Sequence, residues 1–191
     1  MTNISNPFFY AIFVAMSNKC ERCIVKKFNG LQTLNSEQLK CISDGKVTRT
    51  FKKGDVIFDE GDHLKGIYCV RYGIAKLSKL STNGKDQIIK FVSNGEVLGQ
   101  RSVIAQEPAN LRAVAVNDMD TCFIPKKIIL DNLHNNAEFT LELLKNLAHE
   151  LKEADDVIVN ISQKPVKNRI AETLIHLEDS FGVDHDGFMI I

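Results

Sequence analysis

Residues 51–77 read FKKGDVIFDEGDHLKGIYCVRYGIAKL, and this stretch decides the fold. It consists of short apolar runs separated by glycines at positions 54, 61 and 73. Runs of this length between closely spaced turn residues are typical of antiparallel strands in a sandwich or barrel. The pattern extends from about residue 44 to 124, through KVTRTF, IAKLSKLS, DQIIKFV, AVAV and TCFI. The sequence therefore predicts an antiparallel β domain over this range.

Helical patterns flank the predicted strands. Before them, NSEQLKCIS predicts a short helix capped by Asn35 or Ser36. After them, PKKIILDNL predicts a helix opened by Pro125. Further along the chain, Pro165 is expected to end a long helical segment that covers about residues 138–162. After it, VKNRIAETLIHLEDSFG predicts a last helix that stops at Gly182.

A segment without glycine or proline, from about residue 138 to 162, predicts one long helix. Its apolar residues repeat at alternating spacings of three and four, which defines an a/d seam. The seam comprises Leu144, Leu147, Leu151, Ala154, Ile158 and Ile161. Because three full heptads are not reached, the pattern alone fits both a helix packed on its own domain and a parallel dimerisation helix.

Composition limits the class of protein. The chain has 191 residues, of which 44% are hydrophobic, so it can bury the core of one sizeable domain and part of a second. The 24 basic residues balance the 24 acidic ones. The net charge therefore produces no overall electrostatic potential that would attract nucleic acid or a basic partner. Five cysteines, an odd number, fit reduced thiols in the cytoplasm better than a disulfide framework.

The apolar stretch PFFYAIFVAM at residues 7–16 is too short to span a bilayer and has no basic residue before it. We interpret it as an extension ahead of a working start at Met16, or as an apolar arm, and expect no membrane association. An export signal is the remaining alternative.

Several residues of the opening stretch carry a resemblance to a known family. Phe51, Gly54, Ile57, Phe58, Gly61, Asp62, Tyr68, Gly73 and Ala75 fall in register on the pattern of the CRP/FNR family of bacterial transcription regulators. The similarity continues through NGEVLG at 94–99, CFIPKK at 122–127 and QKPVKNRIAETL at 163–174. About 170 residues are covered in order, which is far more specific than any single motif.

This resemblance implies an α+β architecture. A cyclic-nucleotide-binding-like jelly roll is followed by a long dimerisation helix and by the first helix of a truncated winged-helix domain. We therefore expect an N-terminal arm with C-x-x-C (1–30), a sensor domain (31–135), the dimerisation helix (136–163) and the start of the DNA-binding domain (164–191). The recognition helix of the family is expected to lie beyond residue 191.

In cyclic-AMP-binding members of the family, the phosphate and ribose are held by a Glu in a G-E dipeptide and by a later Arg-Ser pair. Glu96 matches the Glu, but the Arg-Ser pair falls near Ala109 and Asn110, so the cation is missing. An unpaired anion in an apolar roll is costly, which makes a cyclic nucleotide an unfavoured ligand. The pocket residues expected for some other small-molecule effector are Glu96, Gly99, Arg101, Asn110 and Arg112.

The oxygen-sensing branch of the family holds an iron-sulfur cluster with cysteines near the N-terminus and one in a C-x-I-P motif. Cys20 and Cys23 resemble the former and Cys122 matches the latter. Such sites use four ligands. No further cysteine follows closely, and neither Cys41 nor His63 is indicated by spacing, so the ligand set is incomplete. An atypical cluster, a thiol-disulfide or zinc role, and cysteines without a site all stay open.

No catalytic motif with a supporting context occurs, so we expect no enzyme. The resemblance implies a homodimeric one-component transcription regulator that senses a signal through the roll and has DNA and RNA polymerase as partners. Lys164, Lys167 and Arg169 are the residues expected to contact the DNA backbone. The alternative is a stand-alone dimeric sensor or ligand-binding module that does not bind DNA.

Overall fold

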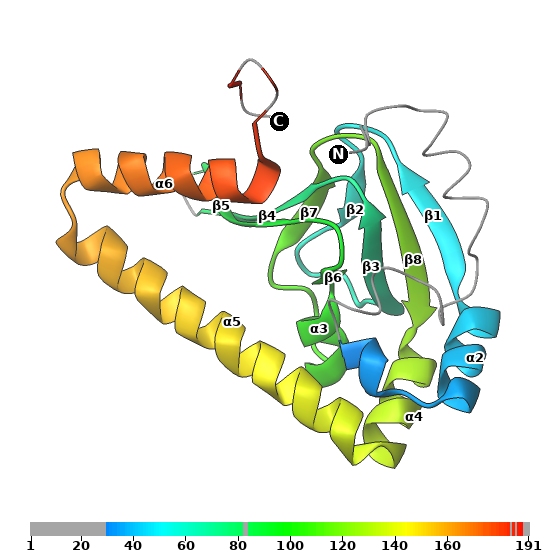
Figure 1. Cartoon of the computed structure of the whole chain (residues 1–191). Helices are drawn as coiled ribbons and strands as arrows, with labels where there is room; N and C mark the ends of the chain where they lie inside the picture. The colour runs from blue at the N-terminus through cyan, green and yellow to red at the C-terminus, as the bar shows by residue number, and fades with distance from the viewer. Residues whose placement is uncertain (1–29, 82–83, 184, 186, 189–191) are drawn as a thin grey trace. The chain divides into compact units, whose positions relative to one another are not determined.

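The computed structural model describes residues 30–81, 84–183, 185 and 187–188. The chain divides into two compact units, Met1–Thr140 and Leu141–Ile191, and the division falls inside the long helix α5 (Ala137–Gln163). The first unit contains both β-sheets and is the antiparallel roll expected from the sequence (Figure 1).

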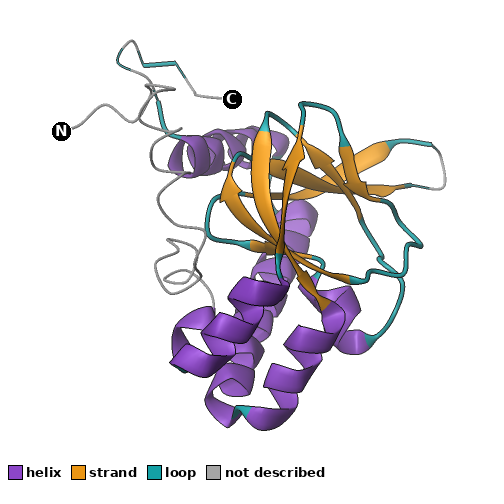
Figure 2. Cartoon of the chain, turned by 90° about the vertical axis from the view of Figure 1, so that its right-hand side faces the viewer, coloured by secondary structure: helices purple, strands orange, loops and turns teal. Residues whose placement is uncertain are grey.

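The roll consists of two four-stranded sheets. One has the order β1-β8-β3-β6 and the other β2-β7-β4-β5. Figure 2 shows these strands in orange. The strands are Val47–Phe51 (β1), Val56–Phe58 (β2), Gly66–Tyr72 (β3), Ala75–Leu80 (β4), Asp86–Val92 (β5), Val97–Leu98 (β6), Arg112–Ala115 (β7) and Met119–Pro125 (β8).

The glycines of the opening stretch occupy turns with positive φ, as their positions between apolar runs predict. Gly54, Gly61 and Gly73 have φ of 92°, 91° and 92°. A side chain is rarely accommodated in this conformation, which explains why the turns between the first strands carry glycine.

Strand β3 is buried on both faces, which explains why GIYCVRY is apolar almost throughout. Its side chains alternate between two buried clusters that lie on opposite faces of the sheet. The inner cluster, inside the roll, comprises Ile57, Phe58, Tyr68, Val70, Ala75, Val92, Leu98, Ala109, Ala113, Ala115 and Met119. The outer cluster, under the helices, comprises Leu31, Leu34, Leu39, Ile42, Ile67, Cys69, Val103, Cys122, Ile124, Ile129 and Phe139.

Short helices cover the outer cluster. They are the 3-10 helix η3 (Gly30–Thr33), α2 (Ser36–Gly45), α3 (Gln100–Ala105) and α4 (Lys126–Asn135). A complete capping box opens α2, in which the Asn35 side chain accepts from the Gln38 N–H while the Gln38 side chain accepts from the Asn35 N–H. Pro125 precedes α4, as predicted. Helices α2 and α4 lie side by side at one end of the roll (Figure 1).

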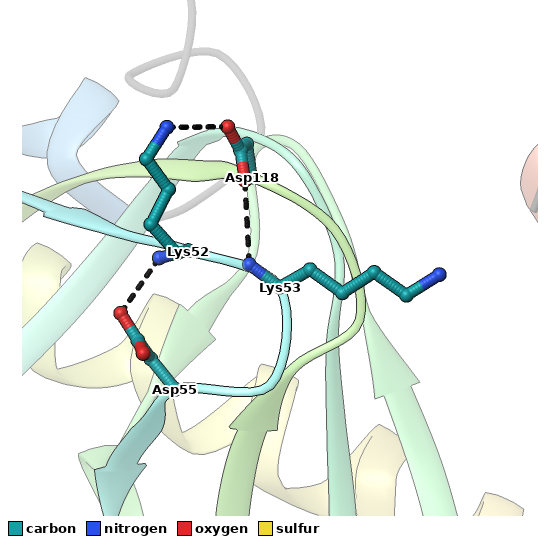
Figure 3. A network of polar contacts seen from close by, with 4 residues as sticks. All are labelled: Lys52, Lys53, Asp55 and Asp118. Carbon is teal, nitrogen blue, oxygen red and sulfur yellow. Dashed lines mark hydrogen bonds and ion pairs between the residues drawn. The ribbon is translucent and has the colours of Figure 1, made fainter.

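A polar network ties two loops together at the other end of the first sheet (Figure 3). Asp118, in the turn between β7 and β8, accepts from Lys52 Nζ at 2.7 Å and from the Lys53 N–H at 3.3 Å. Asp55 accepts from the Lys52 N–H at 2.7 Å. The hydrogen bond between the side chains of Lys52 and Asp118 raises the pKa of Lys52 and lowers the pKa of Asp118. The network fixes the β7–β8 turn from one side.

The second unit contains the remainder of α5 and helix α6 (Val166–Phe181). Both helices were predicted, and α6 ends at Gly182, whose φ is 72°. Within the described part of the chain, no helix combines the length and the apolar character required to cross a membrane.

Candidate functional site

The sequence analysis placed a ligand pocket around the loop that leads into β6. Glu96 in this loop accepts from the Ser93 N–H at 2.7 Å and pairs with Lys90 Nζ at 3.1 Å. Its carboxylate therefore braces its own loop and the neighbouring strand. Gly99 has φ of 82° and begins α3, and a Cβ there would lie 2.7 Å from Leu64 Cδ1. The positive φ favours glycine at this position, whereas Leu64 Cδ1 is the end of a flexible side chain.

The remaining pocket residues have other partners. Arg101 is exposed on α3, a short helix that the sequence analysis did not predict. Arg112 Nε lies 3.7 Å from Asp59 Oδ1. The carbonyl oxygen of Asn110 accepts from Lys79 Nζ at 3.1 Å. None of the described contacts joins the five predicted pocket residues to one another.

Lys79 is a cation that the sequence reasoning missed near the position of the absent arginine. Its ammonium contacts the Asn110 carbonyl oxygen and also Glu60 Oε1 at 2.9 Å. Lys79 lies on β4, and its side chain is half exposed. Only the pairing of β4 with β7 brings it there, so no local sequence signal could have revealed it.

Four aromatic rings pack together on the inner side of the roll. The Tyr68 ring lies 5.0 Å from that of Phe123, 6.1 Å from that of Phe51 and 6.3 Å from that of Phe58, measured between centroids. Burial raises the pKa of the Tyr68 hydroxyl. Arg49 Cζ lies 4.7 Å from the Phe123 ring centroid, a cation–π contact. These side chains hold the roll together from inside.

The predicted metal or redox cysteines fall in two places. Cys20 and Cys23 lie outside the described residues. Cys122 lies on β8 in the outer cluster and is 4% exposed. Its register partner on β3 is Cys69, which is 3% exposed and belongs to the same cluster. Cys41 lies on α2 and is exposed.

The sequence analysis did not single out Cys69 as a site residue. Its position opposite Cys122 follows from the pairing of strands that are far apart in the chain, which spacing alone cannot reveal. Two thiols on neighbouring strands are thus the densest group of cysteines in the described part of the molecule.

A buried ion pair lies next along the same two strands. The β3–β8 register shifts between Val70 and Tyr72, and Arg71 Nη1 lies 3.4 Å from Asp120 Oδ2. The side chains of Arg71 and Asp120 are only 14% and 10% exposed. Burial raises the pKa of Asp120 despite the attraction of Arg71, and its other oxygen, Oδ1, has no hydrogen-bond partner among the described residues.

The Asp120→Asn variant is expected to change how stability depends on pH. A carboxyl whose pKa is raised on folding favours the folded state at low pH, and this contribution is lost as pH rises from about 4, the pKa of the unfolded group, through the folded pKa. Asparagine does not titrate, so the stability of the variant relative to wild type should increase over that range in urea titrations at several pH values.

Asp118→Asn is the matched control, because the pKa of Asp118 is lowered and not raised. Its stability relative to wild type should fall as pH rises from the lowered folded pKa of Asp118 to about 4, the pKa of the unfolded group, and should not change above that range. If the stability of both variants relative to wild type changed with pH in the same direction, the opposite pKa shifts of Asp120 and Asp118 would be contradicted.

The described residues do not by themselves make a metal centre. They contain no group of three or more His, Cys, Asp or Glu side chains placed to hold a metal ion. Cys69 and Cys122 provide two thiols, whereas a structural zinc or iron-sulfur site takes four ligands. The described part of the chain therefore does not fit a cluster on its own.

Comparison with known proteins identifies the class to which this roll belongs. Residues 48–136 match the cyclic nucleotide-binding domain family. The sensor domain of the transcriptional regulator DNR from Pseudomonas aeruginosa superposes with a TM-score of 0.62 at 20% identity, covering 69% of this chain and 89% of that one. The catabolite activator protein of Thermus thermophilus gives 0.61 at 24%, covering 79% and 71%.

Curated relatives are regulatory proteins. The anaerobic regulatory protein of Bacillus subtilis is 24% identical over 82% of this chain and 67% of its own length. The transcriptional activator Anr of Pseudomonas protegens is 26% identical over 85% and 66%. The electron transport regulator A of Shewanella oneidensis is 26% identical over 78% and 60%. The chain thus spans between three-fifths and two-thirds of the length of these relatives.

The cyclic nucleotide-binding domain, the long helix behind it and these relatives make the chain similar to regulators of the CRP/FNR family.

Proposed function

We propose that this chain is the sensor and dimerisation part of a cytoplasmic, non-enzymatic transcription regulator of the CRP/FNR type. A signal received by the roll alters packing along α5, and two chains together present DNA-binding elements to a near-palindromic site. The relatives named as transcriptional regulators support this function. RNA polymerase is the partner that a promoter-bound regulator of this type would contact.

The observation that carries the proposal is the apolar surface of α5. Leu144, Leu151 and Ile158 follow one another at intervals of seven residues and are 58%, 65% and 65% exposed. An apolar stripe at this spacing on an exposed helix is the surface that a parallel coiled coil buries.

The dimer is tested by placing charges on the stripe. The double variant Leu144→Glu, Leu151→Glu should raise the dimer dissociation constant at least about 100-fold, because each dimer loses four buried leucines and gains four buried carboxylates. Analytical ultracentrifugation over a concentration series measures it. Lys145→Glu, whose side chain is 64% exposed beside the stripe, is the matched control and should stay dimeric.

A wild-type chain that sediments as a monomer throughout, or a double variant that dimerises as wild type does, would contradict the proposal. A dimer of the full-length regulator that binds no DNA of any sequence would instead favour the stand-alone sensor module.

For the DNA contact we propose a backbone role at the start of α6. Lys167 and Arg169 lie in its first turn, beside Lys164. Lys164 Nζ is already engaged by Glu172 Oε1 at 2.6 Å, which makes Lys167 the better placed of the two lysines for a phosphate. Such contacts position a protein on DNA without reading sequence.

We further propose that the signal is not a cyclic nucleotide. Ala109 is buried at the position where the family has its arginine, and the nearby Lys79 is paired with Glu60. An iron-sulfur site that uses Cys20, Cys23 and Cys122 stays a prediction. Iron and sulfide content with a visible spectrum, measured on protein prepared without oxygen, tests it.

A further inference from the structure

The strongest unexplained feature of the roll is the pair of buried cysteines on β3 and β8. Cys69 and Cys122 are register partners, they are 3% and 4% exposed, and both point into the outer cluster. Free cysteine behaves as a small apolar residue, so each would be unremarkable alone. Their placement directly opposite each other gives them chemistry that neither has separately.

The hydrogen-bond pattern fixes which kind of pair they form. On the β8 side of β3, the Lys126 N–H donates to the backbone carbonyl oxygen of Lys65. On the opposite side, the Val70 N–H donates to the backbone carbonyl oxygen of Glu96. Since bonding alternates along an antiparallel pair, Cys69 directs its backbone groups toward β8. Cys69 and Cys122 therefore form a hydrogen-bonded pair, in which the Cα atoms lie about 5.5 Å apart.

This separation suits a disulfide. Disulfides join cysteines whose Cα atoms are about 4.4 to 6.8 Å apart, with Cβ atoms about 3.5 to 4.5 Å apart. Opposed Cβ atoms in an antiparallel sheet are about 4.5 to 5.5 Å apart. Since non-hydrogen-bonded pairs have the closer Cβ atoms, this pair lies toward the upper value, and closing the bond requires its Cβ atoms to approach by about 1 to 2 Å through a local change of the sheet.

A buried ion pair and the helices over the outer cluster surround the two thiols. The Arg71 guanidinium lies on the same strand two residues from Cys69, and its partner Asp120 lies two residues from Cys122. The cover over the thiols comes in part from η3, from α2 and from the segment between them, which contribute Leu31, Leu39 and Leu34 to the outer cluster. The two helices have four and ten residues, and short surface elements open locally at lower free energy than a central sheet.

We propose that Cys69 and Cys122 form a redox-sensitive dithiol that closes to a cross-strand disulfide when a small hydroperoxide reaches it. One thiolate attacks the peroxide O–O bond, becomes a sulfenic acid and releases water or an alcohol. The second thiol attacks the sulfenic sulfur, forms the S–S bond and releases water. Two thiols are oxidised and one peroxide is reduced, which balances the reaction.

Disulfide formation would act on the base of the long helix. Phe139, in the first turn of α5, belongs to the same buried cluster as the two cysteines. A bond that brings the two sulfur atoms to about 2.0 Å from each other must repack this cluster. The inference goes beyond the proposed function, because the bond can be measured whether or not the chain regulates transcription.

The test uses the full chain with Cys20, Cys23 and Cys41 changed to serine, which leaves only the pair. After hydrogen peroxide treatment and removal of the oxidant, the denatured protein should have lost both titratable thiols and about 2 Da, and dithiothreitol should restore both. Proteolysis should yield a single reducible peptide pair that joins the two strands. Adding Cys122→Ser to this background is the control and should yield no such pair.

If the triple variant fails to fold, the same peptide mapping on wild-type protein with differential alkylation gives the answer. There the exposed Cys41 reports that the oxidant was active. Persistence of both buried thiols after Cys41 has reacted would overturn the proposal. So would separate oxidation of the two cysteines, or a disulfide between chains in place of the intrachain bond.

Discussion

Replacing Gly73 by alanine is expected to destabilise the roll by about 3 kcal/mol or more, from backbone strain and overpacking together. Gly73 has φ of 92°, and a Cβ there would lie 2.6 Å from the Asp118 carbonyl oxygen and 2.8 Å from Met119 Cα. Both are backbone atoms. The β7–β8 turn cannot retreat easily, because Lys52 and Lys53 hold Asp118 from the other side.

Gly54→Ala is the matched control, since Gly54 has the same φ of 92° but has open space around the added Cβ. It should cost about 1 kcal/mol, the strain of the conformation alone. Urea unfolding of the two variants measures the difference. Equal losses would show that the close approach of the β7–β8 turn to Gly73 does not exist in solution.

The Phe139→Ala variant is expected to lose about 3 to 5 kcal/mol of unfolding free energy, the usual cost of truncating a buried aromatic side chain. Phe139 is 3% exposed in the outer cluster, and its N–H donates to Asn136 Oδ1 at 2.9 Å. It anchors the first turn of α5 to the roll, and we expect this turn to fray in the variant.

Leu141→Ala is the control on the same helix. Leu141 is 53% exposed and lies outside the predicted seam, so its truncation should cost less than about 1 kcal/mol. Amide hydrogen exchange over residues 137–145 should rise in Phe139→Ala and stay unchanged in the control. Similar stability of both variants would mean that α5 is not anchored through Phe139.

Sequence reasoning predicted those parts of the fold that depend on local chemistry. The helix cap at Asn35, the stop at Gly182 and the glycine turns each depend on a few consecutive residues, and all are present. Helix α3 was missed because it has six residues and begins at Gly99 without a side-chain cap. Its sequence therefore carries no start signal.

The candidate site was harder to predict, because it depends on strand pairing. The strands that carry Cys69 and Cys122 pair across more than 50 residues of intervening chain, and the order of strands in the sheet is not encoded locally. The same applies to Lys79, which reaches Asn110 from another strand. Motif spacing could identify Cys122 on β8 as a candidate site residue, but it could not show that Cys69 lies opposite it on β3.

Because α5 is one continuous helix, a small tilt at its first turn moves its far end by a larger distance. Its 27 residues give a rod of about 40 Å at 1.5 Å per residue, and only its first turn contributes to the buried clusters of the roll. A tilt of about 5° at that base would displace the far end by about 3 Å, as much as a whole residue of strand length. Under the proposed function, small changes in packing around Phe139 would thus become larger displacements along α5.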